Sequence, residues 1–211
     1  MKITDNVYLL DSTKGAYVYL ITGDETLLID TGFPWKGRSI LKELEAMGIE
    51  PGKIKYILLT HNDIDHIGNA ALLQELTGAD VLVSAEDLPA ILGTEDRKGF
   101  KKYLKYIFKA KRPASLKTFE PGADICGVRV IPTPGHTPGH VCFLYKDVLF
   151  AGDLIKSQGD RFIPFPGGMN WDIPMVLQSY DKISGYPFKW VCPAHSPPAE
   201  RSGRMPSAPG V

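Results

Sequence analysis

Residues 60 to 68 read Thr60-His61-Asn62-Asp63-Ile64-Asp65-His66-Ile67-Gly68 and contain two imidazoles and two carboxylates within six positions. Three groups of the same chemical kinds follow later in the chain, namely His136, Asp153 and His195. This mixture of nitrogen and oxygen ligands suits zinc, or iron and manganese, and open coordination positions would make such a site catalytic. The residues therefore predict a metal centre that hydrolyses its substrate with metal-bound water.

The segments on either side of residues 60–68 predict how this site is held. Residues 54–59 form a nearly continuous apolar run, which is typical of a strand buried on both faces. A helix of about residues 69–76 is expected to follow. The candidate ligands would then occupy a strand-to-helix turn, where loop backbone is held by rigid elements.

Short apolar runs and amphipathic segments alternate through the rest of the chain. The other expected strands cover residues 6–10, 16–22, 26–30, 81–84, 128–131, 140–145, 148–151 and 190–193, and the other expected helices cover residues 36–47 and 173–184. The pattern is two similar halves rather than a series of βαβ units. It predicts an α+β fold, a four-layer αββα sandwich in which two sheets pack face to face with helices outside.

We expect one domain over residues 1–200, with a helical insertion at about residues 86–112. The remaining residues, 201–211, are rich in Ser, Gly and Pro and are expected to form a flexible tail. Residues 97–112 carry eight basic side chains, and their apolar residues recur at helical spacing. This amphipathic helix is interpreted either as an ordinary surface helix or as a lid or interfacial helix for an anionic or acyl substrate.

The composition of the 211-residue chain excludes several classes of partner. Basic and acidic residues balance at 24 each, so nothing in the net charge points to nucleic acid. The start of the chain lacks the apolar run of a signal peptide, and no run approaches the roughly 20 apolar residues of a membrane span. The three cysteines, Cys126, Cys142 and Cys192, are an odd set without a close pair, which favours a reducing compartment. We expect a cytoplasmic protein.

In kind, order and spacing these residues resemble the metallo-β-lactamase superfamily, in a branch similar to glyoxalase II and the lactonases. The resemblance begins at Leu28-Ile29-Asp30-Thr31-Gly32 and spans most of the chain. It implies an αββα sandwich with a one- or two-metal site at one edge. The implied ligands are His61, Asp63 and His136 for one divalent metal ion and Asp65, His66 and His195 for a second, with Asp153 bridging the pair. A bridging water or hydroxide is the implied nucleophile.

Asp65 and Asp153 are the predicted catalytic residues. Asp65 could orient the nucleophile and pass a proton to the leaving group. The family's Asp-Thr-Gly turn supports the loops around the site, so Asp30 is expected to position a ligand rather than to bind metal. His140 is expected to be a buried, hydrogen-bonded histidine and not a ligand.

Asp63 departs from the usual family motif, which has histidine at this position. In this chain the motif reads His-x-Asp-x-Asp-His. A carboxylate still binds zinc, but it removes one unit of positive charge from the two-metal site. The bound water should therefore be less acidic, and anions should be attracted less strongly. Zinc is the expected metal, and the harder oxygen ligand makes iron or manganese an alternative.

Three functions remain open from the sequence. The first is a hydrolase that cleaves an ester-like bond in a small molecule: a lactone, a thioester or a carboxylic ester. The second is an iron-dependent oxidoreductase on the same fold, similar to the persulfide dioxygenases or to the flavin-associated di-iron branch. The third is a metal-binding member of the family with little turnover. The complete two-metal ligand set favours the hydrolase, and a homodimer is the one assembly considered.

Overall fold

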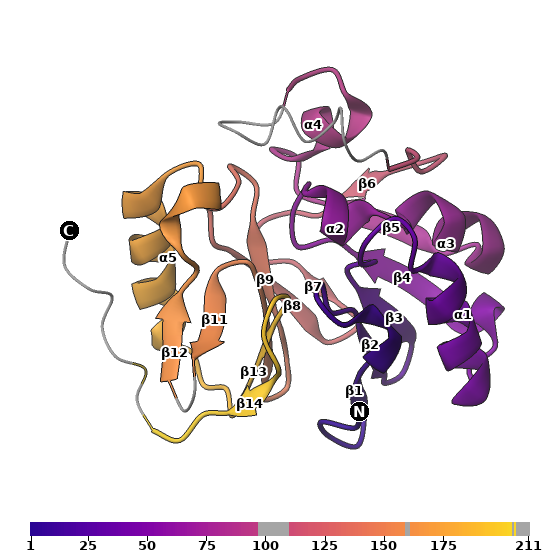
Figure 1. Cartoon of the computed structure of the whole chain (residues 1–211), viewed down its shortest axis with the longest axis horizontal. Coiled ribbons are helices and arrows are strands. Elements are labelled where there is room, and N and C mark those ends of the chain that lie inside the picture. The colour runs from indigo at the N-terminus through magenta and orange to yellow at the C-terminus, as the bar shows by residue number, and fades with distance from the viewer. Residues whose placement is uncertain (97–109, 159–160, 204, 206–211) are drawn as a thin grey trace.

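Two six-stranded β-sheets face each other in the computed structural model, and helices cover their outer faces (Figure 1). The structure describes residues 1–96, 110–158, 161–203 and 205. The first sheet has the strand order β1-β2-β3-β4-β5-β6, and the second has the order β14-β13-β10-β9-β8-β7. A separate hairpin consists of β11 and β12. This arrangement confirms the predicted four-layer α+β fold.

The strands have the following bounds. The first sheet consists of β1 (Val7–Leu9), β2 (Tyr19–Thr22), β3 (Thr26–Ile29), β4 (Ile54–Leu58), β5 (Asp80–Val83) and β6 (Lys117–Thr118). The second consists of β7 (Asp124–Ile125), β8 (Val128–Pro132), β9 (Val141–Tyr145), β10 (Val148–Gly152), β13 (Trp190–Pro193) and β14 (Ala199–Glu200). The hairpin strands are β11 (Ile155–Gln158) and β12 (Arg161–Pro164).

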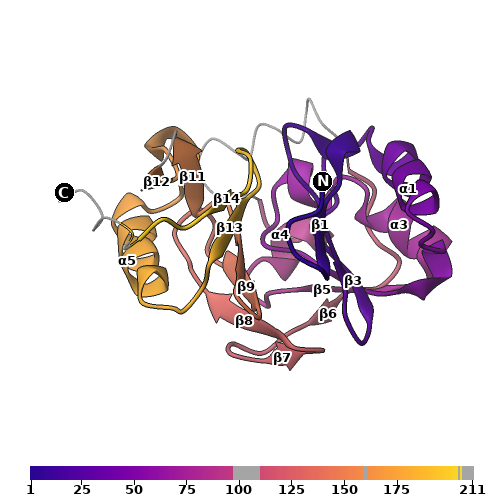
Figure 2. The ribbon, with the colours of Figure 1, turned by 90° about the horizontal axis from the view of Figure 1, so that it is seen from below.

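The α-helices among the described residues are α1 (Gly37–Ala46), α2 (Ile64–Ile67), α3 (Ala70–Thr77), α4 (Leu88–Leu92) and α5 (Ile173–Ser184). Short 3-10 turns cover Asp11–Thr13, Pro51–Lys53 and Gly167–Met169. Seen from below, α1 and α3 cover the first sheet and α5 covers the second, at opposite ends of the molecule (Figure 2). No helix in the part of the chain that the structure describes is long and apolar enough to cross a membrane.

Three apolar layers hold these elements together, because side chains of a strand point alternately to its two faces. In β2, Tyr19 and Ile21 enter the layer between the sheets, where they join Phe143 and Phe150 of the second sheet. Leu20, between them, instead joins the layer under α1 and α3. A third layer lies between the second sheet and α5, which contributes Tyr180 among others. Each sheet is therefore buried on both faces.

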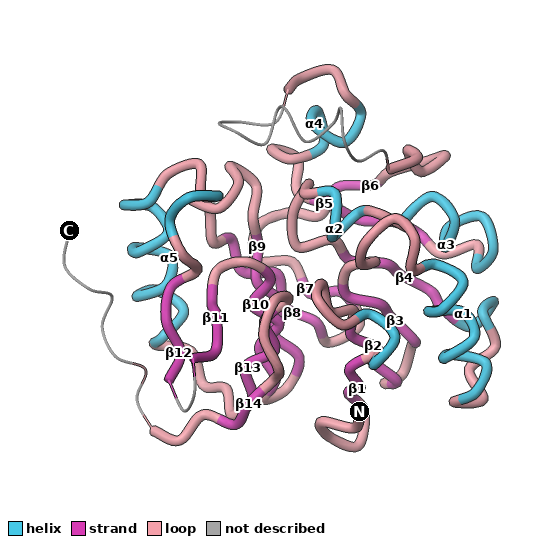
Figure 3. The backbone as a smooth tube through the Cα atoms, viewed as in Figure 1, coloured by secondary structure: helices cyan, strands magenta, loops and turns pink. Residues whose placement is uncertain are grey.

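Strand direction brings several loops to one edge of this sandwich. The strands β3, β4, β5 and β6 run parallel, so their carboxyl ends lie at the same edge of the first sheet. In the second sheet β10 and β13 are also parallel. Loops and turns join the elements at this edge (Figure 3). Ligand sites in sheet proteins are commonly built from loops at carboxyl strand ends.

The structure differs from the sequence-based expectations in several elements. The strand expected from residue 16 begins at Tyr19. Asp65 and His66 lie on the short helix α2 and not in an open turn. The hairpin of β11 and β12 was not among the expected strands, and these two strands form a sheet of their own. Of the expected helical insertion, residues 88–92 form α4, and residues 97–109 lie outside the described residues.

Candidate metal centre

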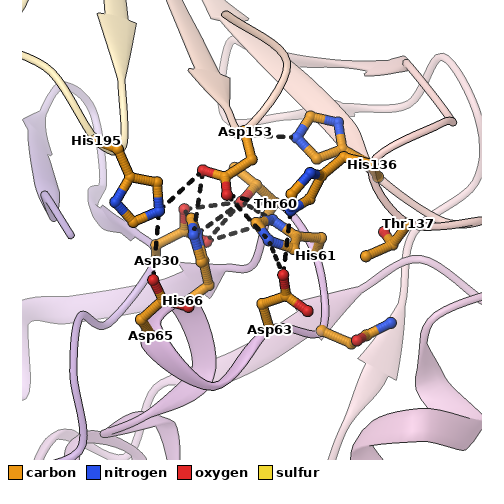
Figure 4. A network of polar contacts seen from close by, with 12 residues as sticks. Asp30, Thr60, His61, Asp63, Asp65, His66, His136, Thr137, Asp153 and His195 are labelled. Carbon is orange, nitrogen blue, oxygen red and sulfur yellow. Dashed lines mark hydrogen bonds and ion pairs between the residues drawn. The ribbon is translucent and has the colours of Figure 1, made fainter. Parts of the chain in front are cut away.

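Seven side chains from four segments of the chain meet at the edge where the parallel strands end (Figure 4). His61 and Asp63 follow β4, and Asp65 and His66 lie on α2 directly after them. The other three come from the loop between β8 and β9, the end of β10 and the end of β13, and are His136, Asp153 and His195. All seven sequence-predicted site residues are thus brought together.

A first group is buried and consists of His61, Asp63, His136 and Asp153. One potential ligand atom from each lies within 4.8 Å of the others. The Oδ2 atom of Asp63 is 3.4 Å from Nε2 of His61 and 3.1 Å from Nε2 of His136. These distances place a carboxylate between two imidazoles, so Asp63 occupies the position that its place in the motif predicts.

A second group consists of Asp65, His66 and His195 and also meets the 4.8 Å criterion. Oδ2 of Asp65 lies 3.3 Å from Nε2 of His195. The Asp65 and His195 side chains are 24% and 22% exposed, whereas His61 is fully buried. The second group therefore forms the side of the cluster that solvent and a small molecule can reach.

Asp153 faces both groups. Its Oδ2 atom is 3.1 Å from Nε2 of His136, and its Oδ1 atom is 3.2 Å from Nε2 of His195 and 3.4 Å from Nε2 of His66. One carboxylate thus directs one oxygen toward each group. Asp153 is therefore the residue that connects the two groups.

Each of the four imidazoles contacts a protein group through Nδ1 and directs Nε2 into the cluster. The Nδ1 partners are Thr60 Oγ1 for His61 at 3.0 Å, Asp30 Oδ2 for His66 at 2.8 Å, Asn170 Oδ1 for His136 at 2.7 Å and the Gly15 carbonyl for His195 at 2.6 Å. An oxygen acceptor at Nδ1 keeps the proton there and leaves Nε2 as the ligand atom. The rings are therefore oriented before any ion binds.

The cluster also leaves buried polar atoms unsatisfied. Nε2 of His61, Nε2 of His66 and Oδ1 of Asp153 have no hydrogen-bond partner among the residues that the structure describes. Buried polar atoms without partners destabilise a protein unless a ligand or water satisfies them. Lone pairs of nitrogen and oxygen that converge in this way fit divalent metal ions.

Asp30 positions two residues of the cluster from behind. It accepts hydrogen bonds from the Thr60 backbone N–H at 2.8 Å and from the Thr60 hydroxyl, and it binds Nδ1 of His66. Its backbone has a φ of 61°, a left-handed conformation that Asp tolerates better than most residues. Asp30 contacts no Nε2 atom of the cluster, in agreement with its expected supporting role.

His140 is occupied by other contacts. Its Nδ1 atom lies 3.1 Å from the Thr133 carbonyl, and its Nε2 atom accepts the backbone N–H of Asp153 at 3.1 Å. A Cβ atom at Gly152 would come within 2.7 Å of that Nε2 atom, which explains the glycine before Asp153. His140 therefore positions Asp153 and has no nitrogen left for a metal.

The charges of the cluster are strongly coupled. Burial opposes ionisation of Asp153, but the neighbouring His66, His136 and His195 hold its pKa well below the ordinary value. Burial also disfavours the charged form of His66, but Asp30 and Asp153 raise its pKa well above 6.5. The pKa of His61 is lowered, mainly by burial and then by the charge of His66. Without metal, His66 thus carries charge more readily than His61 does.

Other segments of the chain also contact the cluster. Asn170 and the Gly15 carbonyl orient two histidines from distant segments. The Phe165 ring lies 5.3 Å from the His136 ring and 5.7 Å from the His195 ring, and it forms an apolar wall beside both groups. Cys192 is fully buried in the layer between the sheets, so it is a core residue despite its closeness to His195 in the chain.

The sequence and the fold were compared with those of known proteins. The sequence model of the metallo-beta-lactamase superfamily matches residues 12–195, a range that includes all seven residues of the cluster. Metallo-beta-lactamase domain-containing protein 1 of Xenopus laevis is 34% identical over 148 residues, covering 68% of this chain and 55% of the relative. A hydroxyacylglutathione hydrolase of Buchnera aphidicola subsp. Schizaphis graminum is 30% identical over 148 residues, covering 69% of this chain and 50% of the relative.

The chain thus spans about half the length of these two relatives. A solved structure of TTHA1623 in a di-iron-bound form matches with a TM-score of 0.73 and 26% identity, covering 88% of this chain and 90% of the other. Fold, residue cluster and sequence match agree. The chain belongs to the metallo-beta-lactamase superfamily.

Proposed function

We propose that this chain is a dinuclear metal hydrolase that cleaves an ester-like bond in a small molecule. One observation carries the proposal: two groups of ligand atoms share Asp153, which directs one carboxylate oxygen to each. Two-metal sites of this kind attack a carbonyl or phosphoryl group with an activated water. The ligands would be His61, Asp63 and His136 for one ion and Asp65, His66 and His195 for the other, with Asp153 shared.

The residues of the chain have distinct roles in this proposal. When bound, two divalent ions lower the pKa of a shared water and polarise the substrate carbonyl. Asp65 is partly exposed on the open side of the cluster, where it can orient the nucleophile and transfer a proton to the leaving group. Phe165 covers the imidazoles of His136 and His195 and excludes water from one side.

A shallow, open hollow lies beside the first group and is lined by His136, Thr137 and Trp171 among others. Trp171 is 43% exposed, so its ring is available to contact an apolar group. The relative named as a hydroxyacylglutathione hydrolase supports an acyl substrate, since an acylglutathione is a thioester. Lactones and carboxylic esters present the same carbonyl to the cluster.

Zinc is the proposed metal, because four imidazoles and three carboxylates suit it. The di-iron form of TTHA1623 keeps iron as the alternative. A cytoplasmic location and a homodimer remain predictions from the sequence.

The test combines elemental analysis of the purified protein with a panel of lactones, thioesters and carboxylic esters. We expect about two divalent ions per chain, hydrolysis of at least one ester class, and loss of turnover after chelation with recovery on adding metal. An Asp153→Asn variant should lose at least about 100-fold in kcat/KM, because one shared ligand is weakened. One iron per chain with oxygen consumption would instead support the oxidoreductase. Two bound ions without turnover of any substrate would support a binding protein.

A further inference from the structure

Asp87 lies outside the metal cluster and connects the two loops that supply three of the four residues of the first group. The residue is fully buried at the start of α4. Its Oδ2 atom accepts the Asn62 backbone N–H at 3.0 Å and the Thr137 hydroxyl at 2.7 Å. Its Oδ1 atom accepts the Gly139 backbone N–H at 2.9 Å. One carboxylate therefore holds donors from two segments that are 75 residues apart in the chain.

The positions of these donors are informative. Asn62 stands between His61 and Asp63, Thr137 directly follows His136, and Gly139 directly precedes His140. Asn62 and Thr137 are thus adjacent in the chain to residues of the cluster. Gly139 is adjacent to His140, which accepts the backbone N–H of Asp153. A shift of the Asp87 carboxylate would move the backbone that carries three of the four groups around the first metal position.

The packing around Asp87 shows that this connection is close. A Cβ atom at position 139 would overlap the Ser84 hydroxyl and come within 2.8 Å of Asp87 Cγ. Only glycine lets the 133–140 loop approach the carboxylate this closely. Burial raises the pKa of Asp87, whereas the hydrogen bonds from Thr137, Gly139 and Asn62 favour its charged form. All three donors thus compensate for burying the carboxylate.

We propose that Asp87 is a positioning residue that sets the distance between His136 and the His61–Asp63 pair, and thereby the affinity of the first metal position. The inference rests on the proposed function in one respect, which is that this group holds a metal ion. The hydrogen bonds of the Asp87 carboxylate go to Asn62, Thr137 and Gly139 and not to the second group, Asp65, His66 and His195, so the affinity of the second group should change little.

The test is titration of metal-free protein with Co²⁺, monitored by the ligand-field absorption spectrum and by competition with a chelator. In Asp87→Asn one carboxylate oxygen becomes an NH₂ group, which faces an N–H or O–H donor and cannot accept its hydrogen bond. We expect the first-position affinity to fall about 10- to 100-fold, the typical effect of losing an outer contact of a metal ligand. The spectrum of that position should change, and the affinity of the second position should stay within about threefold.

Two further variants separate positioning from general destabilisation. Ile91 lies on α4 one turn after Asp87, and its buried side chain packs in the apolar layer on the outer face of the first sheet. The Ile91→Ala variant removes that side chain. It should lower the melting temperature without changing either affinity or the spectrum. Thr137→Val removes one of the three hydrogen bonds with little change in shape, so it should fold and weaken the first position by a smaller factor. Added to Asp87→Asn, it should have little further effect, because the same contact is already disturbed.

The outcomes are distinguishable. If wild-type protein binds two cobalt ions and Asp87→Asn binds them with unchanged affinities and spectrum, the positioning role is wrong and the proposed function stands. Equal weakening of both positions, or the same spectral change in Ile91→Ala, would also overturn it. If wild-type protein binds no metal, both the inference and the proposed function fail.

Discussion

Oδ2 of Asp63 lies 3.1 Å from Nε2 of His136, although 73 residues separate the two in the chain. The same oxygen is 3.4 Å from Nε2 of His61. A carboxylate thus stands where the superfamily's usual motif has an imidazole, and the fold accommodates it without displacing its neighbours from the cluster. Compared with a neutral histidine at this position, the Asp63 carboxylate adds one negative charge to the metal site.

Replacing Asp63 with His should retain metal binding and shift the pH dependence of turnover to lower pH. One negative charge is removed from the site, so the bound water becomes more acidic. The pH-rate profile of kcat/KM for wild type and variant checks this. An unchanged profile would contradict the electrostatic explanation.

Asp30→Asn should weaken the second metal position and destabilise the fold. Asn tolerates the left-handed backbone at this position, so the substitution tests the carboxylate rather than the turn. One of the oxygens shared by Thr60 and His66 is replaced by a donor, which should cost about 1–3 kcal/mol in the free energy of unfolding. Chemical denaturation of metal-free protein measures this cost. Stability equal to wild type would show that the Asp30 contacts contribute little.

Asn170→Ala should lower the affinity of the first metal position by about 10-fold, since His136 loses the acceptor at Nδ1 that orients its ring. Met169→Ala is a matched control, because Met169 is the exposed residue that directly precedes Asn170. Both variants can be compared by chelator competition. Similar losses of affinity in the two would indicate a general effect of the loop.

Metal affinity should rise with pH. Burial disfavours the charged forms of His66 and His195, but Asp153, with Asp30 at His66, raises both pKa values above 6.5. These protons must leave before Nε2 can bind metal, so each contributes up to about tenfold per pH unit below the folded-state pKa. Calorimetry in buffers of different ionisation heat should show proton release, and pH-independent affinity would contradict this.

In metal-free protein the same raised pKa values have the opposite effect. Protonated His66 and His195 stabilise the fold fully below about pH 6.5, and this contribution is lost as the pH rises through their folded-state pKa values. Thermal unfolding of chelated protein across this range measures the loss. A contribution that grows with pH would have the wrong sign for these two groups.

Removing the metal should itself lower the melting temperature, because ions that bind only the folded chain stabilise it by mass action. At 1,000 times the dissociation constant the contribution is about 4 kcal/mol. Differential scanning calorimetry with and without chelator measures this change in melting temperature. The control is Asp80→Asn, which changes an exposed carboxylate paired with Lys117. This variant should show the same metal-dependent shift as wild type.

The sequence by itself was enough to predict the four-layer fold and to select the seven residues of the cluster. Tyr19, Leu20 and Ile21 are all apolar because their strand is buried on both faces, and a continuous apolar run of this kind can be recognised in the sequence. His61 and Asp63 could be selected because ligand chemistry is a property of the side chain and their spacing is local. The short strands β6, β7 and β14 could not be predicted, since two residues carry no period.

Only the tertiary structure decided which groups orient those residues. Asn170 could have been any loop asparagine, yet it binds His136 across 34 positions, and the Gly15 carbonyl binds His195 across 180. Asp87 likewise gains its role from donors that other segments bring to it. A backbone carbonyl or a single polar side chain has no local pattern that marks it as a partner. Its role arises when packed sheets bring distant loops to one edge, because a hydrogen bond depends on distance in space and not on separation in the chain.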